Sequence, residues 1–334
     1  MIARHRIAVH LLAGALIASM MLDTRAALAQ QPNKTTVTAA VIGVSVSIWP
    51  AIVAKEKGFF TEEGLDLDVV SSGASSRSLQ QVAAGSAAIG SSSMVDSIRA
   101  IGAGATLKIF LNSLAVGTHS LIAAKNIKTV KDLKGKRVMT GGQSDITNIW
   151  WQAVAKHFGL DPDKDVELLF SGSTTARMSA LLSGAIDATV LSTPQSFQAI
   201  EQGWTDLGPV APYLGEFPMM IWHVNDRWAQ ANEKALLAFT RAHNRAVSYM
   251  SDPAHKVEVS EMLAKASSSS VADALKTWDV CMQIKAFVSD GSITDATVLR
   301  VRDTLLRSGD LKPPAMAPNT YYDNRYVSAV AKQV

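Results

Sequence analysis

Two segments of this chain match each other without a gap when one is shifted by 99 positions, which indicates an internal duplication. Residues 67–70 align with residues 166–169, and each of these runs is apolar except for one acid in second place. Residues 72–76 align with residues 171–175, and both are rich in serine and glycine. A chain of 334 residues built in this way is long enough to fold into two similar halves.

Each copy alternates short apolar runs with amphipathic segments, which is the pattern of β-α-β units around a parallel sheet. Every apolar run ends in a loop of small polar residues, and a segment with helical periodicity follows it. We expect strands at 37–44, 67–70 and 88–90 with helices at 50–63 and 76–84, and in the second copy strands at 137–140, 166–170 and 188–191 with helices at 146–158 and 175–183.

The loops that follow the predicted strands are rich in hydroxyl groups. Ligands bind outside the carboxyl ends of parallel strands, so the loops of two facing halves are expected to converge on one cleft. Most of these loops precede a helix, where free backbone N–H groups favour an anion, although the same residues also serve as ordinary helix caps. The candidate ligand-binding residues in these loops are Ser45, Ser47, Ser72, Ser92, Ser93, Gln143, Ser144, Thr147, Ser171, Ser173, Ser192 and Thr193.

Three larger side chains complete the candidate binding site. Trp49 and Trp222 can stack on a flat or apolar part of a ligand, with a place in the core as the alternative for Trp49. Asp145 either caps a helix or faces the cleft, where it would favour a cationic or donor-rich ligand and repel a sulfonate. No Lys or Arg lies in the loops, apart from Arg77 just after one, so backbone N–H groups, hydroxyls and an amide would hold an anion.

Composition excludes several kinds of function. Cys281 is the only cysteine, so neither an internal disulfide nor a cysteine metal cluster can form, and we expect no metal and no cofactor. The formal charge is +3, of which residues 1–29 contribute +2. The remaining chain is nearly neutral, which gives no electrostatic reason to expect a nucleic acid partner.

The first 29 residues have the layout of a secretory signal peptide. Arg4 and Arg6 precede an apolar run from residue 7 to residue 22, and Ala27-Leu28-Ala29 supplies an expected cleavage site. The apolar run is 16 residues long, shorter than the roughly 20 that span a bilayer. Because no cysteine lies directly after the cleavage site, we expect an unlipidated periplasmic protein.

Four segments resemble the nitrate, sulfonate and thiamine-precursor (SsuA/THI5-like) branch of the substrate-binding proteins of ABC importers: residues 50–67, 83–85, 130–138 and 182–188. The resemblance implies an α/β, two-lobed periplasmic-binding-protein fold of type II, with a mainly parallel sheet in each lobe and two crossovers. It also implies a monomer that delivers a small ligand to a permease and its ATPase.

The same resemblance sets the expected domain boundaries. Lobe 1 would comprise residues 35–117 and lobe 2 residues 118–222, with residues 223–334 forming a helical part that completes lobe 1. Helical periodicity recurs in that part at 232–251, 254–264, 270–288 and 295–308. His119 lies beside the first crossover, where a structural role is more common than contact with a ligand.

Three functions remain open at this level. Transport binding is favoured, with an oxyanion such as an alkanesulfonate as the preferred ligand and a heteroaromatic, thiamine-precursor type of ligand as the alternative. A periplasmic sensor partner would have the same sequence features. An enzyme that forms a pyrimidine is disfavoured, because the enzymes of this fold carry a cysteine-rich iron motif that Cys281 alone cannot reproduce.

Overall fold

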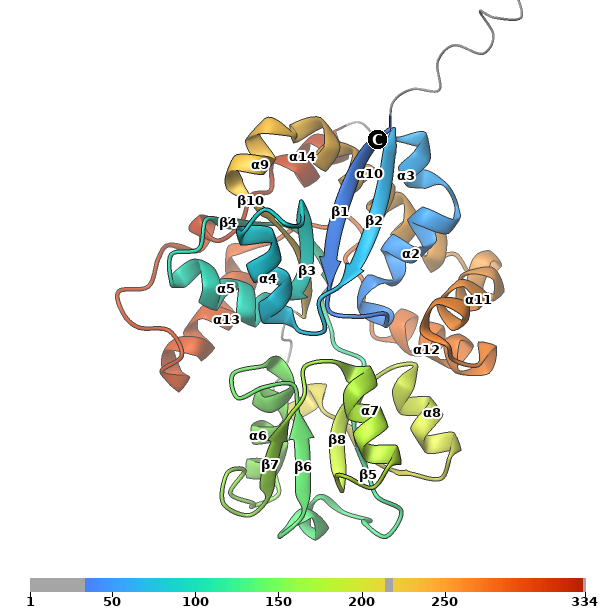
Figure 1. The fold of residues 1–334 in the computed structure, drawn as a ribbon, viewed down its shortest axis with the longest axis vertical. Helices are drawn as coiled ribbons and strands as arrows, with labels where there is room; N and C mark the ends of the chain where they lie inside the picture. Colours follow the sequence, from blue (N-terminus) through green and yellow to red (C-terminus); the bar gives the residue numbers. More distant parts are fainter. Residues whose placement is uncertain (1–33, 214–218, 333–334) are drawn as a thin grey trace, which may run out of the picture. The chain divides into compact units, whose positions relative to one another are not determined.

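A computed structural model describes residues 34–213 and 219–332. The predicted signal peptide therefore lies outside the described residues. Residues 36–334 form one unit that contains two five-stranded sheets, shown in Figure 1. The first sheet has the order β2-β1-β3-β10-β4, formed by β2 (Leu65–Ser71), β1 (Thr35–Val41), β3 (Ile89–Ser93), β10 (Met220–Asn225) and β4 (Leu107–Leu114).

The second sheet repeats this arrangement. Its order is β7-β6-β8-β5-β9, formed by β7 (Glu167–Phe170), β6 (Arg137–Thr140), β8 (Ala188–Ser192), β5 (His119–Ala123) and β9 (Thr205–Pro209). Each predicted repeat unit thus supplies three neighbouring strands of one sheet. The fourth strand in each order is β10 in the first sheet and β5 in the second. Each of these strands forms directly after the chain has crossed over from the other sheet.

The two α/β sheets are mixed rather than mainly parallel. β1 pairs in parallel with β3, and β6 pairs in parallel with β7 and β8. β10 and β5 run antiparallel to their neighbours, because each enters its sheet from the edge at which the parallel strands end.

The helices begin and end close to the predicted positions. The segment 50–63 is an exception, because Gly58 adopts a left-handed conformation with φ 75° and divides it into two helices. The predicted helix 270–288 also ends earlier, at Gln283. The described helices are α2 (Trp49–Glu56), α3 (Phe59–Glu62), α4 (Ser75–Ala83), α5 (Met94–Gly102), α6 (Ile146–His157), α7 (Thr174–Leu182), α8 (Gln195–Glu201), α9 (Asp226–Ala231), α10 (Glu233–Ser251), α11 (Lys256–Ser267), α12 (Val271–Gln283), α13 (Asp295–Ser308) and α14 (Arg325–Ala331).

The helices after residue 225 pack around the first sheet, where Figure 1 shows them coloured yellow to red. α10 contacts α2 and α3, α13 contacts α5, and α14 contacts β4. The chain returns to the first sheet before the expected boundary at residue 222, because β10 already begins at Met220. None of the helices in the described ranges is both long and apolar enough to span a bilayer.

Candidate functional site

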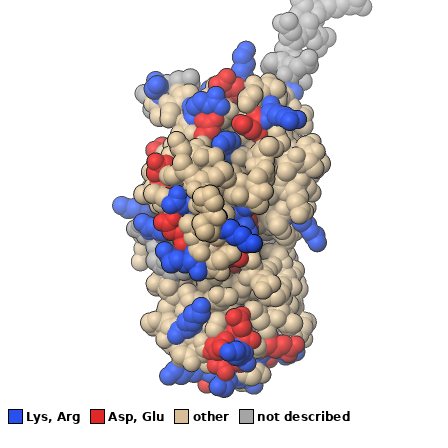
Figure 2. All heavy atoms as spheres, turned by 90° about the vertical axis from the view of Figure 1, so that its left-hand side faces the viewer, with Lys and Arg blue, Asp and Glu red and all other residues tan. Residues whose placement is uncertain are grey.

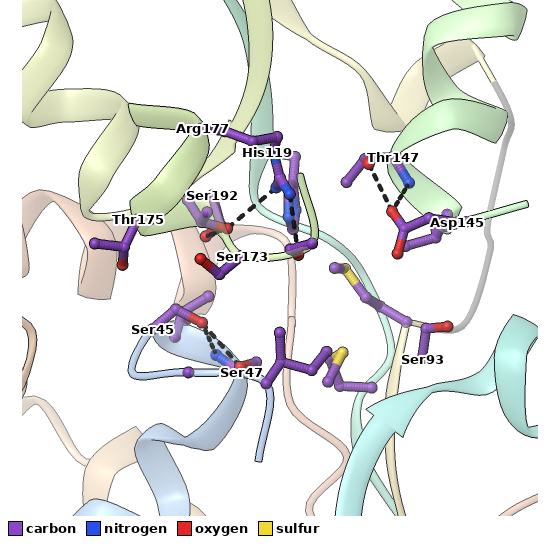
Figure 3. A pocket seen from close by; sticks show the side chains of 18 of the residues that line it. Ser45, Ser47, Ser93, His119, Asp145, Thr147, Ser173, Thr175, Arg177 and Ser192 are labelled. Carbon is purple, nitrogen blue, oxygen red and sulfur yellow. Dashed lines mark hydrogen bonds between the residues drawn. The ribbon is translucent and has the colours of Figure 1, made fainter. Parts of the chain in front are cut away.

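A pocket lies where the parallel strands of both sheets end (Figure 3). It encloses a cavity of about 60 Å³. The loops after β1, β3, β6, β7 and β8 all contribute to it, as expected for ligands that bind at the carboxyl ends of strands. Its lining residues are Ile42, Gly43, Val44, Ser45, Val46, Ser47, Ser93, Leu114, His119, Asp145, Ile146, Thr147, Gly172, Ser173, Thr174, Thr175, Arg177, Ser192, Met219 and Met220.

The pocket brings together about half of the candidate residues: Ser45, Ser47, Ser93, Asp145, Thr147, Ser173 and Ser192. Four of them also cap helices. The side chains of Ser45, Ser93, Asp145 and Ser173 accept backbone N–H groups at the first turns that follow them. Capping and a place in the pocket are therefore compatible, because a cap residue stands at the strand end that faces the pocket.

The other candidate hydroxyls are bonded elsewhere. Ser72 donates to Gln81, Ser92 is bonded to Ser97 and His223 in the core, and Thr193 is bonded to Thr118. Gln143, Ser144 and Ser171 are also absent from the lining. Their backbone carbonyl oxygens accept hydrogen bonds: that of Gln143 from the Asn148 side chain, that of Ser144 from Arg99 and that of Ser171 from Arg177.

Neither tryptophan lines the pocket, so Trp49 takes the core position left open as its alternative, and the expected place of Trp222 in the cleft is wrong. Trp49 is fully buried, and its indole N–H donates to the carbonyl of Val259 in α11 at 3.0 Å. Trp222 is also fully buried and packs edge-on against Phe239 of α10. Both indoles are covered by the helices that follow residue 225, whose packing could not be read from the repeat alone.

Arg177 is a pocket residue that sequence reasoning missed. It lies in the first turn of α7, two residues beyond the 171–175 loop, and its side chain is only 2% exposed. The expectation that the pocket would lack a cation is therefore wrong. The available signal was helical geometry, because a residue four positions after the N-cap Ser173 can return to the same side of the helix.

The Arg177 guanidinium is held in place by oxygen atoms. Its Nε donates to the carbonyl of Val190, its Nη1 to the carbonyls of Ser171 and Gly172, and its Nη2 to the hydroxyl of Thr174. No carboxylate of the described ranges forms an ion pair with it. Burial lowers its pKa, but a guanidinium keeps its proton in proteins. The pocket therefore contains a fixed positive charge that has no ion-pair partner among the described residues.

His119 lies next to this charge at the start of β5, with its ring against Trp150 at 4.7 Å between centroids. Burial, and secondarily the positive charge of Arg177, lowers the pKa of His119 to about 3. The ring is therefore neutral at physiological pH. Its buried Nδ1 has no hydrogen-bond partner among the described residues.

Asp145 stands at the other end of the pocket, at the start of α6, as Figure 3 shows. Its Oδ1 accepts from the backbone N–H of Thr147 at 2.8 Å and from the hydroxyl of Thr147 at 2.6 Å. Burial and the negative charge of Asp96 raise its pKa, while Arg177 and the bonds from Thr147 act in the opposite direction.

The two sheets' loops touch beside the pocket. Gly73 follows β2 and Gly172 follows β7, and the two glycines occupy equivalent places in the sequence repeat. A Cβ on Gly172 would lie only 2.7 Å from the carbonyl oxygen of Gly73. Arg99 of α5 also donates to the carbonyl of Ser144 at 2.6 Å, and Gln195 of α8 donates to that of Val44.

Substituting Gly172→Ala is expected to weaken ligand binding about tenfold by holding the two halves apart. Alanine suits the backbone, because Gly172 is not among the positive-φ residues. The dissociation constant can be measured by calorimetry. Gly142→Ala is the control, since its Cβ would meet only the Cβ of Asp145 at 3.7 Å. Equal affinity for the Gly172→Ala and wild-type proteins would contradict the role of this contact.

Known proteins of several kinds are similar to this chain. The 4-amino-5-hydroxymethyl-2-methylpyrimidine phosphate synthase of Candida albicans is 24% identical over 60% of this chain and 62% of its own. The alkanesulfonate-binding protein SsuA from Xanthomonas axonopodis pv. citri, solved bound to MOPS, is 17% identical, with a TM-score of 0.70 over 87% of this chain and 99% of its own. The periplasmic nitrate-binding protein NrtA from Synechocystis PCC 6803 is 16% identical, with a TM-score of 0.73 over 91% and 90%.

At these identities the two solved structures establish the fold alone, which is that of the two-lobed binding proteins. The family described as NMT1/THI5 like matches residues 45–256. That match covers more than half of the sequence, and it includes every strand of the two sheets except β1 and most of the pocket. The chain therefore belongs to the NMT1/THI5-like family.

Proposed function

We propose that this chain is the extracytoplasmic solute-binding component of an ABC importer, and that it captures a small polar ligand between its two halves. The observation that carries the proposal is the buried Arg177 guanidinium in a pocket lined by both halves. A ligand that contacts both halves stabilises the closed arrangement, which a permease can distinguish from the open one.

An oxyanion such as an alkanesulfonate is our preferred ligand class. Arg177 provides a positive charge, and the Ser173 hydroxyl stands nearby as a donor (Figure 3). The hydroxyls of Ser45 and Ser47 are bonded to each other at 2.8 Å and leave one further donor for a ligand. The first turn of α7 adds the positive end of a helix dipole. The names of the similar solved proteins, for an alkanesulfonate and for nitrate, agree with this class. A heteroaromatic ligand has less support, because Trp49 and Trp222 lie in the core.

We propose a binding role rather than an enzymatic one, although one relative is a synthase. The thiol of Cys281 is buried in α12, and burial raises its pKa, so it is a poor nucleophile. Ser92 and His223 are hydrogen-bonded at 2.9 Å, but both are fully buried outside the pocket. Neither group can reach a ligand in the pocket.

The expected location and partners are part of the same proposal. The N-terminal pattern supports export to the periplasm, where a monomer would deliver its ligand to a permease with an ATPase, or alternatively to a sensor. Figure 2 shows Lys and Arg interspersed with Asp and Glu on the face in view, which does not suit a polyanion such as nucleic acid.

A ligand screen tests this proposal. The protein without residues 1–29 is mixed with alkanesulfonates, nitrate, bicarbonate, small carboxylates, amino acids and pyrimidines, and its unfolding temperature is measured. A ligand present at 100 times its dissociation constant adds about 2.7 kcal/mol to the free energy of unfolding, which is several degrees. Tryptophan emission is expected to change as well, because Trp150 packs on the pocket residue His119. A screen with no binder in any class would count against the proposal.

A further inference from the structure

The pocket holds two opposite charges that are not paired with each other. Arg177 and Asp145 both line it, and each affects the pKa of the other through space. No ion pair between them is present among the described residues. Asp96 is another carboxylate that affects the pKa of Asp145, and it is already paired with Arg99 at 2.6 Å. Arg177 and Asp145 therefore remain available to a ligand.

Each charge also keeps some hydrogen-bonding capacity. A guanidinium has five N–H donors, and the bonds of Arg177 to Val190, Ser171, Gly172 and Thr174 use four of them. Oδ1 of Asp145 accepts two bonds from Thr147, whereas Oδ2 accepts none from the described residues. One donor and one acceptor of opposite charge thus remain unused on two residues that line the same cavity.

This arrangement favours a ligand with charges of both signs. A simple anion would gain the attraction of Arg177 but would be repelled by Asp145 within the same cavity. A simple cation would gain the attraction of Asp145 but would be repelled by Arg177. A zwitterion aligned between them gains both attractions, and the side chains of Ile146, Met219 and Met220 offer apolar contact for a carbon chain between its charges.

Resting on the binding function proposed above, we infer that the ligand is a small zwitterion, with a carboxylate or sulfonate held by Arg177 and an ammonium group held by Asp145. Asp145 is then the residue that determines specificity, and Arg177 is the general anchor for the acid group.

Matched ligand pairs test this inference by calorimetry. The first pair is 3-aminopropanesulfonate and butanesulfonate, and the second is 3-aminopropanoate and butanoate; in each pair a methyl group replaces the ammonium group. We expect the wild-type protein to bind the amino member of one pair at least tenfold more tightly than the alkyl member. Asp145→Asn is expected to abolish that preference by weakening binding of the amino member.

The control is Asp161→Asn, which alters a carboxylate that also accepts from nearby backbone N–H groups but lies outside the pocket. It should leave the tenfold preference intact. If Asp145→Asn does not fold, Asp145→Ser replaces it, because serine is a good N-cap without a charge.

Three results would overturn the inference. Equal or tighter binding of the alkyl members by the wild-type protein would overturn it while leaving the proposed binding function in place. So would an unchanged preference in the Asp145 variant. Failure to bind any of the four probes would overturn it too, and the wider ligand screen then decides whether the binding function survives.

Discussion

Arg177→Met is expected to raise the dissociation constant for the acid-bearing ligand found in the screen at least 100-fold. The substitution keeps a long side chain but removes the positive charge of the pocket and its free N–H donor. Charge-assisted hydrogen bonds in a site shielded from water contribute roughly 3 kcal/mol, which corresponds to about a 100-fold change in affinity. Calorimetric titration of both proteins measures the effect.

The matched control is Arg77→Met. Arg77 lies in the first turn of α4, at nearly the same place in the first repeat, but it is exposed and outside the pocket. Its loss should change the affinity less than twofold. Circular dichroism and thermal unfolding are needed for the Arg177 variant, because this guanidinium also satisfies three backbone carbonyls. A folded Arg177→Met protein with wild-type affinity would contradict the assigned role.

The free energy of unfolding is expected to fall by several kcal/mol between pH 7.5 and pH 5. Burial lowers the pKa values of His119 and His223 to about 3 and that of His243 to about 4, from 6.5 in the unfolded chain. The unfolded state therefore binds more protons below pH 6.5, and stability is lost as the pH falls toward the folded-state values. Each histidine contributes about 2 kcal/mol of this loss by pH 5.

Two carboxyl groups act in the opposite direction. Burial raises the pKa values of Asp145 and Asp273, so protonation favours their folded state, and the total loss should be less than the sum for three histidines. Urea unfolding at a series of pH values measures the effect. In His243→Gln, which removes a histidine outside the pocket, the pH dependence should shrink by about 2 kcal/mol. Equal stability of the wild-type protein at pH 7.5 and pH 5 would contradict the lowered pKa values of the three buried histidines.

Much of the fold could be predicted because it depends on local patterns. Apolar runs, loops of small residues and helical periodicity recur in the same order in both copies, and the structure has the corresponding strands and helices in that order. The start of α7 after Ser173 is likewise a local feature, set by a side-chain cap, whereas the left-handed Gly58 divides the segment that was predicted as one helix.

The pocket was predicted less completely, because its residues come from both sheets. Repeat alignment located the strand ends, and Ser45, Ser93, Asp145, Ser173 and Ser192 do lie there. The alignment could not show that the side chains of Ser72 and Ser92 bond to partners within their own half. A serine that faces the pocket and a serine that faces the core have the same place in the sequence pattern.

Local sequence was therefore sufficient for the duplication, the order of strands and helices, and the edge of each sheet at which the pocket forms. Tertiary packing decided which side chains face that pocket. The helices after β10 cover Trp49 and Trp222, and the loop carbonyls of the second half hold Arg177 beside the cavity. The physical reason is that the direction of a side chain at a strand end depends on neighbours distant in the chain, which no local periodicity records.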